Sequence, residues 1–360
     1  MRENINRDIL RIKERKMSKK QPIINHKRKL ASIRKISKIT PINGADNIEK
    51  VHIDGWQCIS KKGEFNEGDM CIYFEIDSFL PIRPEFEFLR KSSFKKMGNK
   101  EGFRLKTIRL KGELSQGLAL PISILNDMDI TIFDIGNDIS DALGVVKFEP
   151  PIPAELKGIA KGPFPSFIRK TDQERVQNIW DDIKDLDETF EVTLKLDGTS
   201  CTYYLNDGVF GVCSRNLELE KSETHIFWKL AREYNIEESL RSYGKNIALQ
   251  GEVIGEGING NTEEIKGQQF FLFDIFNIDD QRYISPSLRK TIFKEFFKNI
   301  YHVPFLKTYA SLKRYNLLYS LLDYAQNCLF GVGEGVVFKS NESNLTFKVI
   351  SNQYLLNKEK

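Results

Sequence analysis

The stretch Glu191-Val-Thr-Leu-Lys-Leu-Asp-Gly-Thr-Ser200 decides how this chain is interpreted. Its apolar residues alternate with polar ones, which predicts a strand that runs into a turn at Gly198. Lys195 stands at the end of this strand, and Asp197 points to the same side of the extended chain. A lysine amine attacks phosphorus only when it is neutral, and a nearby cation or a dry pocket lowers its pKa enough for that. Taken alone, a tetrapeptide such as Lys195-Leu-Asp-Gly198 is more often a solvated strand end than a catalytic site.

Five further short motifs follow Lys195 and favour the catalytic interpretation of this residue over the solvated one. They match, in order, the motif series of the covalent nucleotidyltransferases, which are the ATP-dependent polynucleotide ligases and the mRNA capping enzymes. Because their order agrees as well as their composition, we interpret Lys195 as the nucleophile that forms lysyl-AMP with ATP. The motifs are Ser214-Arg-Asn216, Gln250-Gly-Glu252, Phe271-Leu-Phe-Asp-Ile275, Glu334-Gly-Val-Val-Phe-Lys339 and Thr346-Phe-Lys348.

Three residues of these motifs point to the nucleoside part of the nucleotide. Glu252 follows a predicted strand and precedes a glycine-rich turn, where a carboxylate accepts hydrogen bonds from ribose hydroxyls. The resemblance implies that Phe273 stacks on the adenine, with Phe271 left open as the alternative. It also implies that Leu194, next to the nucleophile, belongs to the nucleotide site. Without the resemblance, the apolar run around Phe273 is only a buried strand.

The charged motif residues divide into metal ligands and phosphate contacts. The resemblance implies that Asp197 and Glu334 hold a divalent metal, Mg²⁺ or Mn²⁺, which offsets the phosphate charge. Lys339 and Lys348 are expected at phosphates, where a cation stabilises the charge that grows during attack. Arg215 matches the family arginine that contacts the 5′-phosphate or the ribose, a role that suits the guanidinium fork.

The first motif and the layout of the chain favour one subgroup. Ser200 stands where DNA ligases and capping enzymes usually have arginine. Only 12 of the 360 residues follow Lys348, so we expect no C-terminal OB domain. The chain resembles an RNA ligase family that places an OB module first and seals 3′-OH to 5′-phosphate RNA ends, notably nicks in duplexes. One departure is that Thr346 and Ile350 flank Lys348 where ligases often present a second basic residue, which shifts phosphate contact toward Lys339.

Two other functions stay open at this point. One is a GTP-using, capping-type nucleotidyltransferase, which Ser200 disfavours. The other is a non-catalytic RNA-binding protein with a decayed nucleotidyltransferase domain, which the intact Lys195, Glu252 and Glu334 disfavour.

Length and pattern predict two domains, since 360 residues are enough for two separate cores. Residues 28–145 contain short alternating strands between turns, which predicts an all-β, OB-like barrel. Residues 165–360 mix strands with amphipathic helices, as expected for an α+β nucleotidyltransferase domain with antiparallel sheets. Residues 146–164 are rich in proline and glycine and are the predicted linker, and residues 1–27 are a basic, flexible lead-in. Because every matched motif lies in the second domain, we expect that domain to form lysyl-AMP by itself.

A basic stretch of the first domain is the predicted nucleic-acid contact. Between residues 85 and 111, lysines and arginines are interleaved with four phenylalanines, and such barrels bind nucleic acid with cations for phosphates and rings for stacking. The alternative is a solvated loop that the phenylalanines anchor to the barrel. The predicted contacts to RNA ends are Lys95, Lys96, Arg104, Lys106 and Arg109.

Three smaller predictions complete the interpretation. Thr171-Asp-Gln-Glu174 has the form of a capping box and predicts a helix to about residue 186, in which the roles of Arg175 and Gln177 stay open. No stretch approaches 18 apolar residues, so we expect no membrane span, and we find no sign of an obligate protein partner. The five cysteines are odd in number and form no C-x-x-C, which predicts free thiols in a reducing cytoplasm. Met17 offers an alternative translation start.

Overall fold

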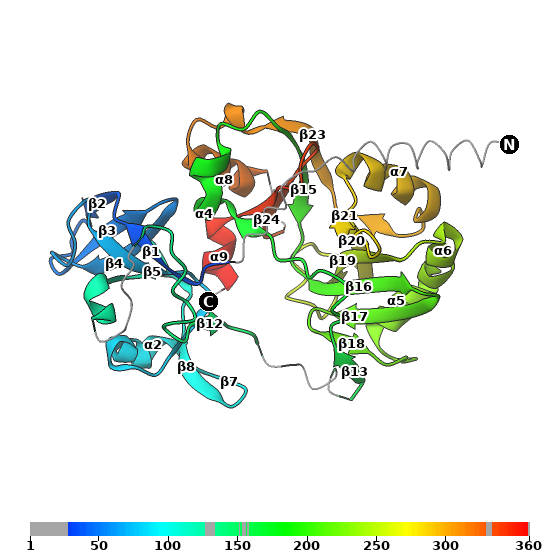
Figure 1. The fold of residues 1–360 in the computed structure, drawn as a ribbon, viewed down its shortest axis with the longest axis horizontal. Helices are drawn as coiled ribbons and strands as arrows, with labels where there is room; N and C mark the ends of the chain where they lie inside the picture. The colour runs from blue at the N-terminus through cyan, green and yellow to red at the C-terminus, as the bar shows by residue number, and fades with distance from the viewer. Residues whose placement is uncertain are drawn as a thin grey trace.

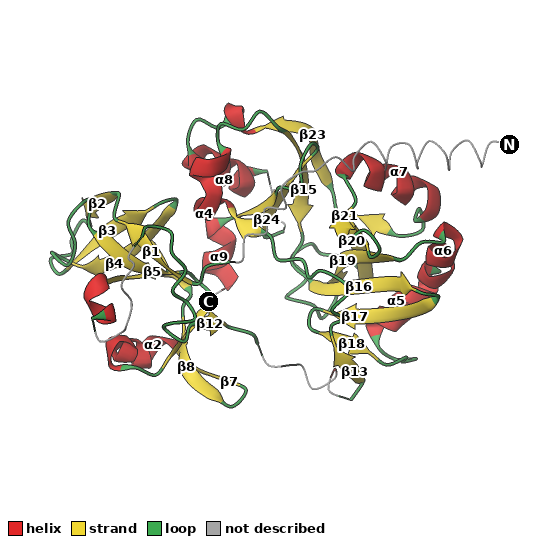
Figure 2. Cartoon of the chain, viewed as in Figure 1, coloured by secondary structure: helices red, strands yellow, loops and turns green. Residues whose placement is uncertain are grey.

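The computed structural model describes residues 28–126, 134–150, 152, 156, 158–328 and 333–358. They form an N-terminal β domain, a five-stranded sheet with helices and an eight-stranded sheet with helices. In Figures 1 and 2 the β domain lies on the left and the larger sheet on the right, with the smaller sheet and its helices between them. An all-β domain followed by an α+β domain is the fold class predicted from the sequence, which is thereby confirmed. No helix in these ranges is long and apolar enough to cross a membrane.

The N-terminal domain is a barrel of short strands, and in its described part every strand pair is antiparallel. Met70–Phe74 packs against two hydrophobic clusters, with Ile72 and Phe74 in one and Cys71 and Tyr73 in the other. Burial on both faces explains why this strand is a continuous apolar run. The strands are β1 (Ala31–Lys35), β2 (Lys38–Pro41), β3 (Ile48–Ile53), β4 (Trp56–Lys61), β5 (Met70–Phe74), β6 (Ser78–Pro81), β7 (Phe94–Met97), β8 (Lys100–Arg104), β9 (Thr107–Leu110), β10 (Glu113–Gln116), β11 (Leu118–Pro121) and β12 (Val146–Lys147), with η2 at Ile122–Leu125.

The basic stretch is folded and is not a loop. It contains η1 (Pro84–Leu89) and α2 (Arg90–Ser93), followed by the β7–β8 hairpin, which projects at the bottom of Figure 1. The prediction that its phenylalanines stack on bases is wrong for Phe86 and Phe103, because both are fully buried in the barrel. Phe88 is 61% exposed.

The five-stranded sheet has the order β14 (Glu174–Arg175), β25 (Thr346–Ile350), β24 (Gly335–Ser340), β15 (Thr189–Lys195) and β23 (Phe305–Ser311). Only the short β14–β25 pair is parallel. Trp180, Leu321 and Phe347 belong to the single cluster that joins the sheet to its helices. These helices are α4 (Val176–Ile183) and α8 (Leu318–Asn327), and η3 (Leu312–Arg314) and α9 (Asn352–Lys358) complete this part.

The eight-stranded sheet has one face covered by helices, which share the largest hydrophobic cluster with it. Its strands follow the order β13 (Ala160–Pro163), β18 (Leu217–Leu219), β17 (Val209–Ser214), β16 (Thr199–Asn206), β19 (Ile247–Gly255), β20 (Gln268–Asn277) and β21 (Arg282–Tyr283), and β22 (Tyr301–His302) pairs in parallel with β20. The helices are α5 (Ile226–Glu233), α6 (Ile236–Tyr243) and α7 (Pro286–Phe296).

The predicted capping box is wrong. The helix begins at Val176, and Arg175 precedes it with an extended backbone. The Glu174 carboxylate accepts hydrogen bonds from the Arg175 backbone N–H and from the Asn178 side-chain amide. A capping box would instead require it to accept from the backbone N–H of Thr171. Pairing of β14 with β25 holds this segment extended, and tertiary contact thereby overrides the local signal.

The barrel docks on the start of α4. Trp56 Nε1 donates to Asn178 Oδ1 at 2.5 Å, and Asn178 Nδ2 donates to Glu75 Oε1 at 2.5 Å. Gly55 N donates to the carbonyl of Gln177 at 3.3 Å. A Cβ at Gly55 would lie 2.9 Å from the Gln177 Cα, so this close approach requires glycine. Gln177 therefore contacts the barrel.

Candidate active site

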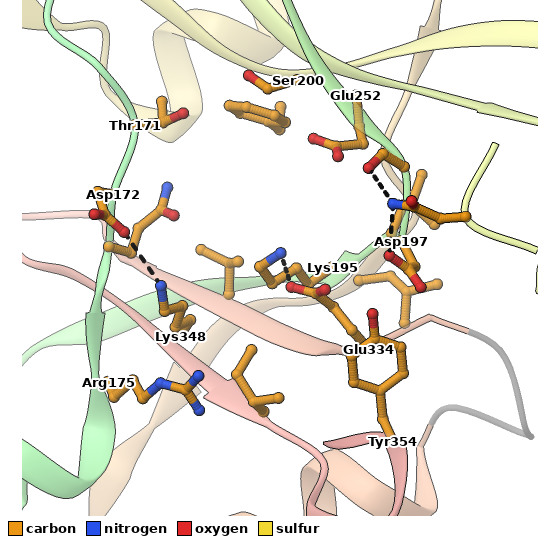
Figure 3. Close-up of a pocket in the computed structure, with 18 of the residues that line it drawn as sticks. Thr171, Asp172, Arg175, Lys195, Asp197, Ser200, Glu252, Glu334, Lys348 and Tyr354 are labelled. Atoms are coloured by element: carbon orange, nitrogen blue, oxygen red, sulfur yellow. Dashed lines mark hydrogen bonds and ion pairs between the residues drawn. The ribbon is translucent and has the colours of Figure 1, made fainter. Parts of the chain in front are cut away.

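A cavity of about 410 Å³ is lined by residues of both sheets and of the barrel. Figure 3 shows Lys195 and Glu334 near its middle, with Asp172 and Lys348 on one side and Glu252 on the other. The structure brings all the residues predicted to bind nucleotide or metal to this one cavity. They are Leu194, Lys195, Asp197, Arg215, Glu252, Phe273, Glu334, Lys339 and Lys348.

Lys195 ends β15, and its ammonium forms an ion pair with the Glu334 carboxylate. The two residues are also joined through the backbone, since Glu334 N donates to the Lys195 carbonyl at 2.8 Å. Burial lowers the pKa of Lys195 to about 8, although the nearby carboxylates of Glu252 and Asp197 oppose this shift. About a tenth of this amine is therefore neutral at pH 7, far more than for a lysine of ordinary pKa, and only the neutral form is a nucleophile.

Glu252 lies on β19 and faces the cavity beside the turn that follows Lys195. Burial raises the pKa of Glu252, while Lys195 and Arg215 oppose the increase. The turn passes so close to this strand that a Cβ on Gly198 would lie 2.3 Å from the Val253 carbonyl oxygen. Gly198 is thus required for packing against β19.

Asp197 is almost fully buried and accepts two hydrogen bonds through Oδ1. Asn259 Nδ2 donates at 3.1 Å and Lys358 Nζ at 2.9 Å. Among the described residues, no three His, Cys, Asp or Glu side chains are grouped closely enough to hold a metal by themselves. A magnesium-type ion keeps several waters and needs only one or two carboxylates plus substrate phosphates. Asp197 and Glu334, both in the cavity wall near Lys195, fit that requirement.

Phe273 lies in the cavity wall, whereas Phe271 stacks on Tyr301 with ring centroids 5.2 Å apart. Lys339 Nζ donates to the Phe273 carbonyl at 2.6 Å and lies 2.8 Å from Asp274 Oδ2. The same ammonium is 5.6 Å from the centroid of the Phe273 ring. A ring and a cation therefore share one side of the cavity.

Lys348 on β25 is a second cation of the cavity wall, and it pairs in register with Val337 on the neighbouring strand β24. Its Nζ lies 3.4 Å from Asp172 Oδ1, and Lys147 Nζ lies 2.5 Å from Asp172 Oδ2. Burial lowers the pKa of Lys348 to about 7, and Asp172 opposes that shift. Asp172 thus stands between two lysines, which together with the charge of Arg215 hold its pKa well below the usual range despite burial.

Sequence reasoning missed several residues of the lining. Arg28, Asp77 and Lys147 come from the N-terminal domain and the segment after it, and Tyr354 and Lys358 come from α9. Arg28, Asp77 and Lys147 are far in sequence from the motifs, whereas Tyr354 and Lys358 follow the last motif closely but belong to none of them.

Arg175, whose role the sequence left open, also lines the cavity. Its side chain is 7% exposed, and within the described residues its Nε and Nη1 have no hydrogen-bond partner. Asp77 lies 3.8 Å from Nη2. A buried guanidinium with open donors suits an anionic ligand.

The five predicted nucleic-acid contacts do not lie together. Arg104 lines the nucleotide cavity, 3.2 Å from Asp77. Lys95 and Lys96 are exposed on the β7–β8 hairpin, where Lys96 pairs with Glu101. Arg109 is exposed on β9 and donates to the Gly112 carbonyl at 2.6 Å, and Lys106 precedes this strand.

Comparisons with known proteins agree with this architecture. A family model described as RNA ligase matches residues 188–350, and one described as an OB-fold domain matches residues 30–122. No curated protein matches the chain. The chain is similar to Naegleria gruberi RNA ligase solved with PPi, at 44% identity and a TM-score of 0.82, over 91% of this chain and 98% of that chain.

Two variants of the same Naegleria gruberi enzyme extend the comparison. A lysine-to-methionine variant with AMP and Mn is 43% identical with a TM-score of 0.83. A lysine-to-alanine variant with ATP and Mn is 43% identical with a TM-score of 0.82. Both alignments cover 91% of this chain and 98% of the other. The chain belongs to the RNA ligase family.

Proposed function

We propose that the chain, as an ATP-dependent RNA ligase, seals 3′-OH and 5′-phosphate RNA ends through lysyl-AMP and RNA-adenylate, with nicks in a duplex as its substrate. The observation that carries this proposal is Lys195. It is an amine of lowered pKa in a cavity that also holds carboxylates suited to a metal and cations suited to phosphates. The similar Naegleria enzyme with ATP and Mn supports the choice of ATP and of a divalent metal.

In the first step the neutral Lys195 Nζ attacks the α-phosphorus of ATP. The bond from this phosphorus to the bridging oxygen breaks, and pyrophosphate leaves with the electron pair. Asp197 and Glu334 would hold Mg²⁺ or Mn²⁺, which supplies charge neutralisation at the phosphates. For the attack Glu334 has to release its ion pair with Lys195, and Glu334 would then be free to hold the metal.

The remaining cavity residues bind and orient the nucleotide. Phe273 and Leu194 contact the adenine, and Glu252 accepts hydrogen bonds from the ribose. Lys339 and Lys348 contact phosphate oxygens, and Lys348 stabilises the charge that grows at the α-phosphate. Arg28 and Arg104 of the barrel and Arg175 at its seam with α4 add positive charge to the cavity wall, which suits the leaving pyrophosphate.

In the second and third steps the RNA ends enter. An oxygen of the 5′-phosphate attacks the phosphorus of lysyl-AMP and releases Lys195. The 3′-OH then attacks the activated 5′-phosphorus, and AMP leaves. Arg215, which is exposed beside the cavity, binds the 5′-phosphate or the ribose with its fork. Lys95, Lys96, Lys106 and Arg109 contact the RNA backbone.

Two features of the whole chain stay predictions. The division into residues 1–27, 28–145, 146–164 and 165–360 is one of them, and residues 1–27 lie outside the described ranges. The other is a cytoplasmic location, which the five free cysteines support.

Labelling with ATP tests the chemistry. Incubation with α-labelled ATP and Mg²⁺ or Mn²⁺, followed by denaturing electrophoresis, should leave label on the protein. γ-Labelled ATP should leave none, because that phosphate departs in pyrophosphate. Label from α-labelled GTP instead of ATP would support the capping-type alternative. Sealing is then measured on a nicked RNA duplex against the same strands unannealed, and equal rates would contradict the preference for nicks.

A further inference from the structure

A group of buried charges lies behind the cavity and has no role in the chemistry above. Its centre is Arg289 on α7, whose side chain is fully buried. The Arg289 guanidinium pairs with Glu191 of β15 through Nη2 and lies 3.2 Å from Asp274 of β20 through Nη1. Its Nε lies 3.4 Å from His302 Nε2 on β22. One guanidinium therefore joins β15 and β20, which carry cavity residues, to β22, which ends just before the cavity residue Val303.

Asp274 connects Arg289 to Lys339, a residue of the cavity wall. Its Oδ1 faces Arg289, while its Oδ2 lies 2.8 Å from Lys339 Nζ. Lys339 and Phe273 line the cavity, whereas Asp274 and Arg289 do not. Because one carboxylate bridges the two cations, the place of Lys339 depends on where Arg289 holds Asp274.

His302 provides a second connection. Its Nδ1 lies 2.8 Å from the Val303 carbonyl oxygen, which only accepts, so Nδ1 carries the hydrogen. Nε2 is then the acceptor for the Arg289 Nε–H. Burial lowers the pKa of His302 to about 3, so the ring is neutral and carries its single hydrogen on Nδ1. Val303 lines the cavity, so Arg289 reaches the wall by this route as well.

We propose that Arg289 is a positioning residue of the nucleotide site, which acts through Asp274 on Lys339 and through His302 on Val303. The inference rests on the proposed role of Lys339 in nucleotide binding. Arginine suits the position because its planar fork serves two carboxylates and the histidine at once, which a lysine ammonium does not.

The charges around Lys339 make this role measurable. Burial lowers the pKa of Lys339 to about 8. The groups that face it are Asp274 of β20, Glu191 of β15, Arg289 of α7 and the neutral His302 of β22. Asp274 and Glu191 raise the pKa of Lys339, whereas Arg289 lowers it. Removing Asp274 and removing Arg289 should therefore move this pKa in opposite directions, which a general loosening of the packing would not do.

The test measures ATP affinity by calorimetry from about pH 6 to about pH 9 in full-length protein carrying Lys195→Met. That substitution stops turnover and removes one further amine that titrates in the same range. Lys348, with a pKa of about 7, still titrates, so every variant is compared with the same Lys195→Met parent. Affinity should fall as pH rises through the pKa of Lys339, since the ammonium loses its charge. Asp274→Asn should move this fall to lower pH by about one unit or more. Arg289→Met should move it to higher pH. Arg289→Lys keeps the charge and should leave the midpoint in place while affinity drops.

Lys290→Met is the matched control. Lys290 lies next to Arg289 on α7 and pairs with Glu191 at 2.9 Å, and the described contacts of Lys290 do not include Asp274. It should leave the pH midpoint unchanged. A shift as large as that of Arg289→Met would overturn the inference, because removal of any cation on α7 would then act alike.

Lys339→Met separates this inference from the proposed function. If Lys339→Met binds ATP like its parent at every pH, the role of Lys339 is wrong. If it binds weakly while Asp274→Asn and Arg289→Met leave the midpoint in place, the role of Arg289 is wrong. Circular dichroism melts check folding. If Arg289→Met does not fold, Arg289→Lys decides the matter, because an ATP affinity equal to that of its parent would overturn the positioning role.

Discussion

Lys358 Nζ lies 2.9 Å from Asp197 Oδ1 and 2.6 Å from the Tyr354 hydroxyl, so α9 reaches the carboxylate that we assign to the metal. The same helix packs Leu355 against the hydrophobic cluster of the barrel. The Asp197 side chain is 5% exposed and that of Lys358 is 48% exposed, so Lys358 is the partner that can leave. α9 thus links the barrel to the metal site and holds a cation there.

Lys358→Met should tighten metal binding, because the ammonium competes with the metal for Asp197. Partly exposed ion pairs contribute up to about 1 kcal/mol, so half-saturation with Mn²⁺ should occur at a concentration about 1.5- to 5-fold lower. Electron paramagnetic resonance of free Mn²⁺ measures this directly. Lys358→Arg keeps the charge and should behave like the parent. An unchanged Mn²⁺ affinity in Lys358→Met would show that the contact does not compete.

The rate of lysyl-AMP formation should rise with pH and level off above about 8, because only neutral Lys195 attacks. At saturating ATP, Glu252→Gln should move the midpoint to lower pH, since Glu252 is a carboxylate that raises the pKa of Lys195. Single-turnover labelling across pH measures both. Lys195→Ala should remove the label, as should Lys195→Arg, whose guanidinium stays protonated. Label on either variant would identify another nucleophile.

Residues of the N-terminal barrel are now also expected to take part in ATP binding. We expected the second domain to suffice, but Arg28, Asp77 and Arg104 of the barrel line the cavity. Arg175→Met should therefore raise the KM for ATP by about tenfold or more, because charge-assisted hydrogen bonds contribute about 1.5–3 kcal/mol. Arg109→Met, on the barrel but outside the cavity lining, is the control and should leave KM unchanged. An unchanged KM in Arg175→Met would place the pyrophosphate away from the seam between the barrel and α4.

RNA binding should depend on four cations outside the cavity, of which Lys95, Lys96 and Arg109 are exposed and Lys106 is half-buried. Replacing Lys95, Lys96, Lys106 and Arg109 by methionine should weaken binding to nicked duplex RNA without changing lysyl-AMP formation. For every cation that binds a phosphate, its replacement should reduce the slope of log K against log salt by about 0.9. Filter binding over a salt series gives the slope. If the slope keeps its parental value, the barrel contacts RNA through other residues.

Much of the fold and of the site was predictable because it depends on patterns of residues that are close together in the sequence. Alternation and turn residues indicated an all-β domain, and the order of the motifs indicated which residues belong to one nucleotide site. The structure brings Lys195, Phe273 and Lys348 to the same cavity. Periodicity reports which face of an element is buried, and each motif is a short run whose residues are neighbours in sequence.

The tertiary structure decided what depends on contacts between distant residues. Phe86 and Phe103 look like stacking rings in sequence, yet the barrel buries both completely. The Thr171–Glu174 signal yields to strand pairing with β25, so α4 starts at Val176. The pairing of Arg289 with Asp274 likewise has no local signature. The chemistry that we propose for the site could be inferred from the sequence, because the motif residues that carry it are near neighbours in the chain. Only packing decided which barrel and helix side chains complete it, because those contacts join positions far apart in the chain.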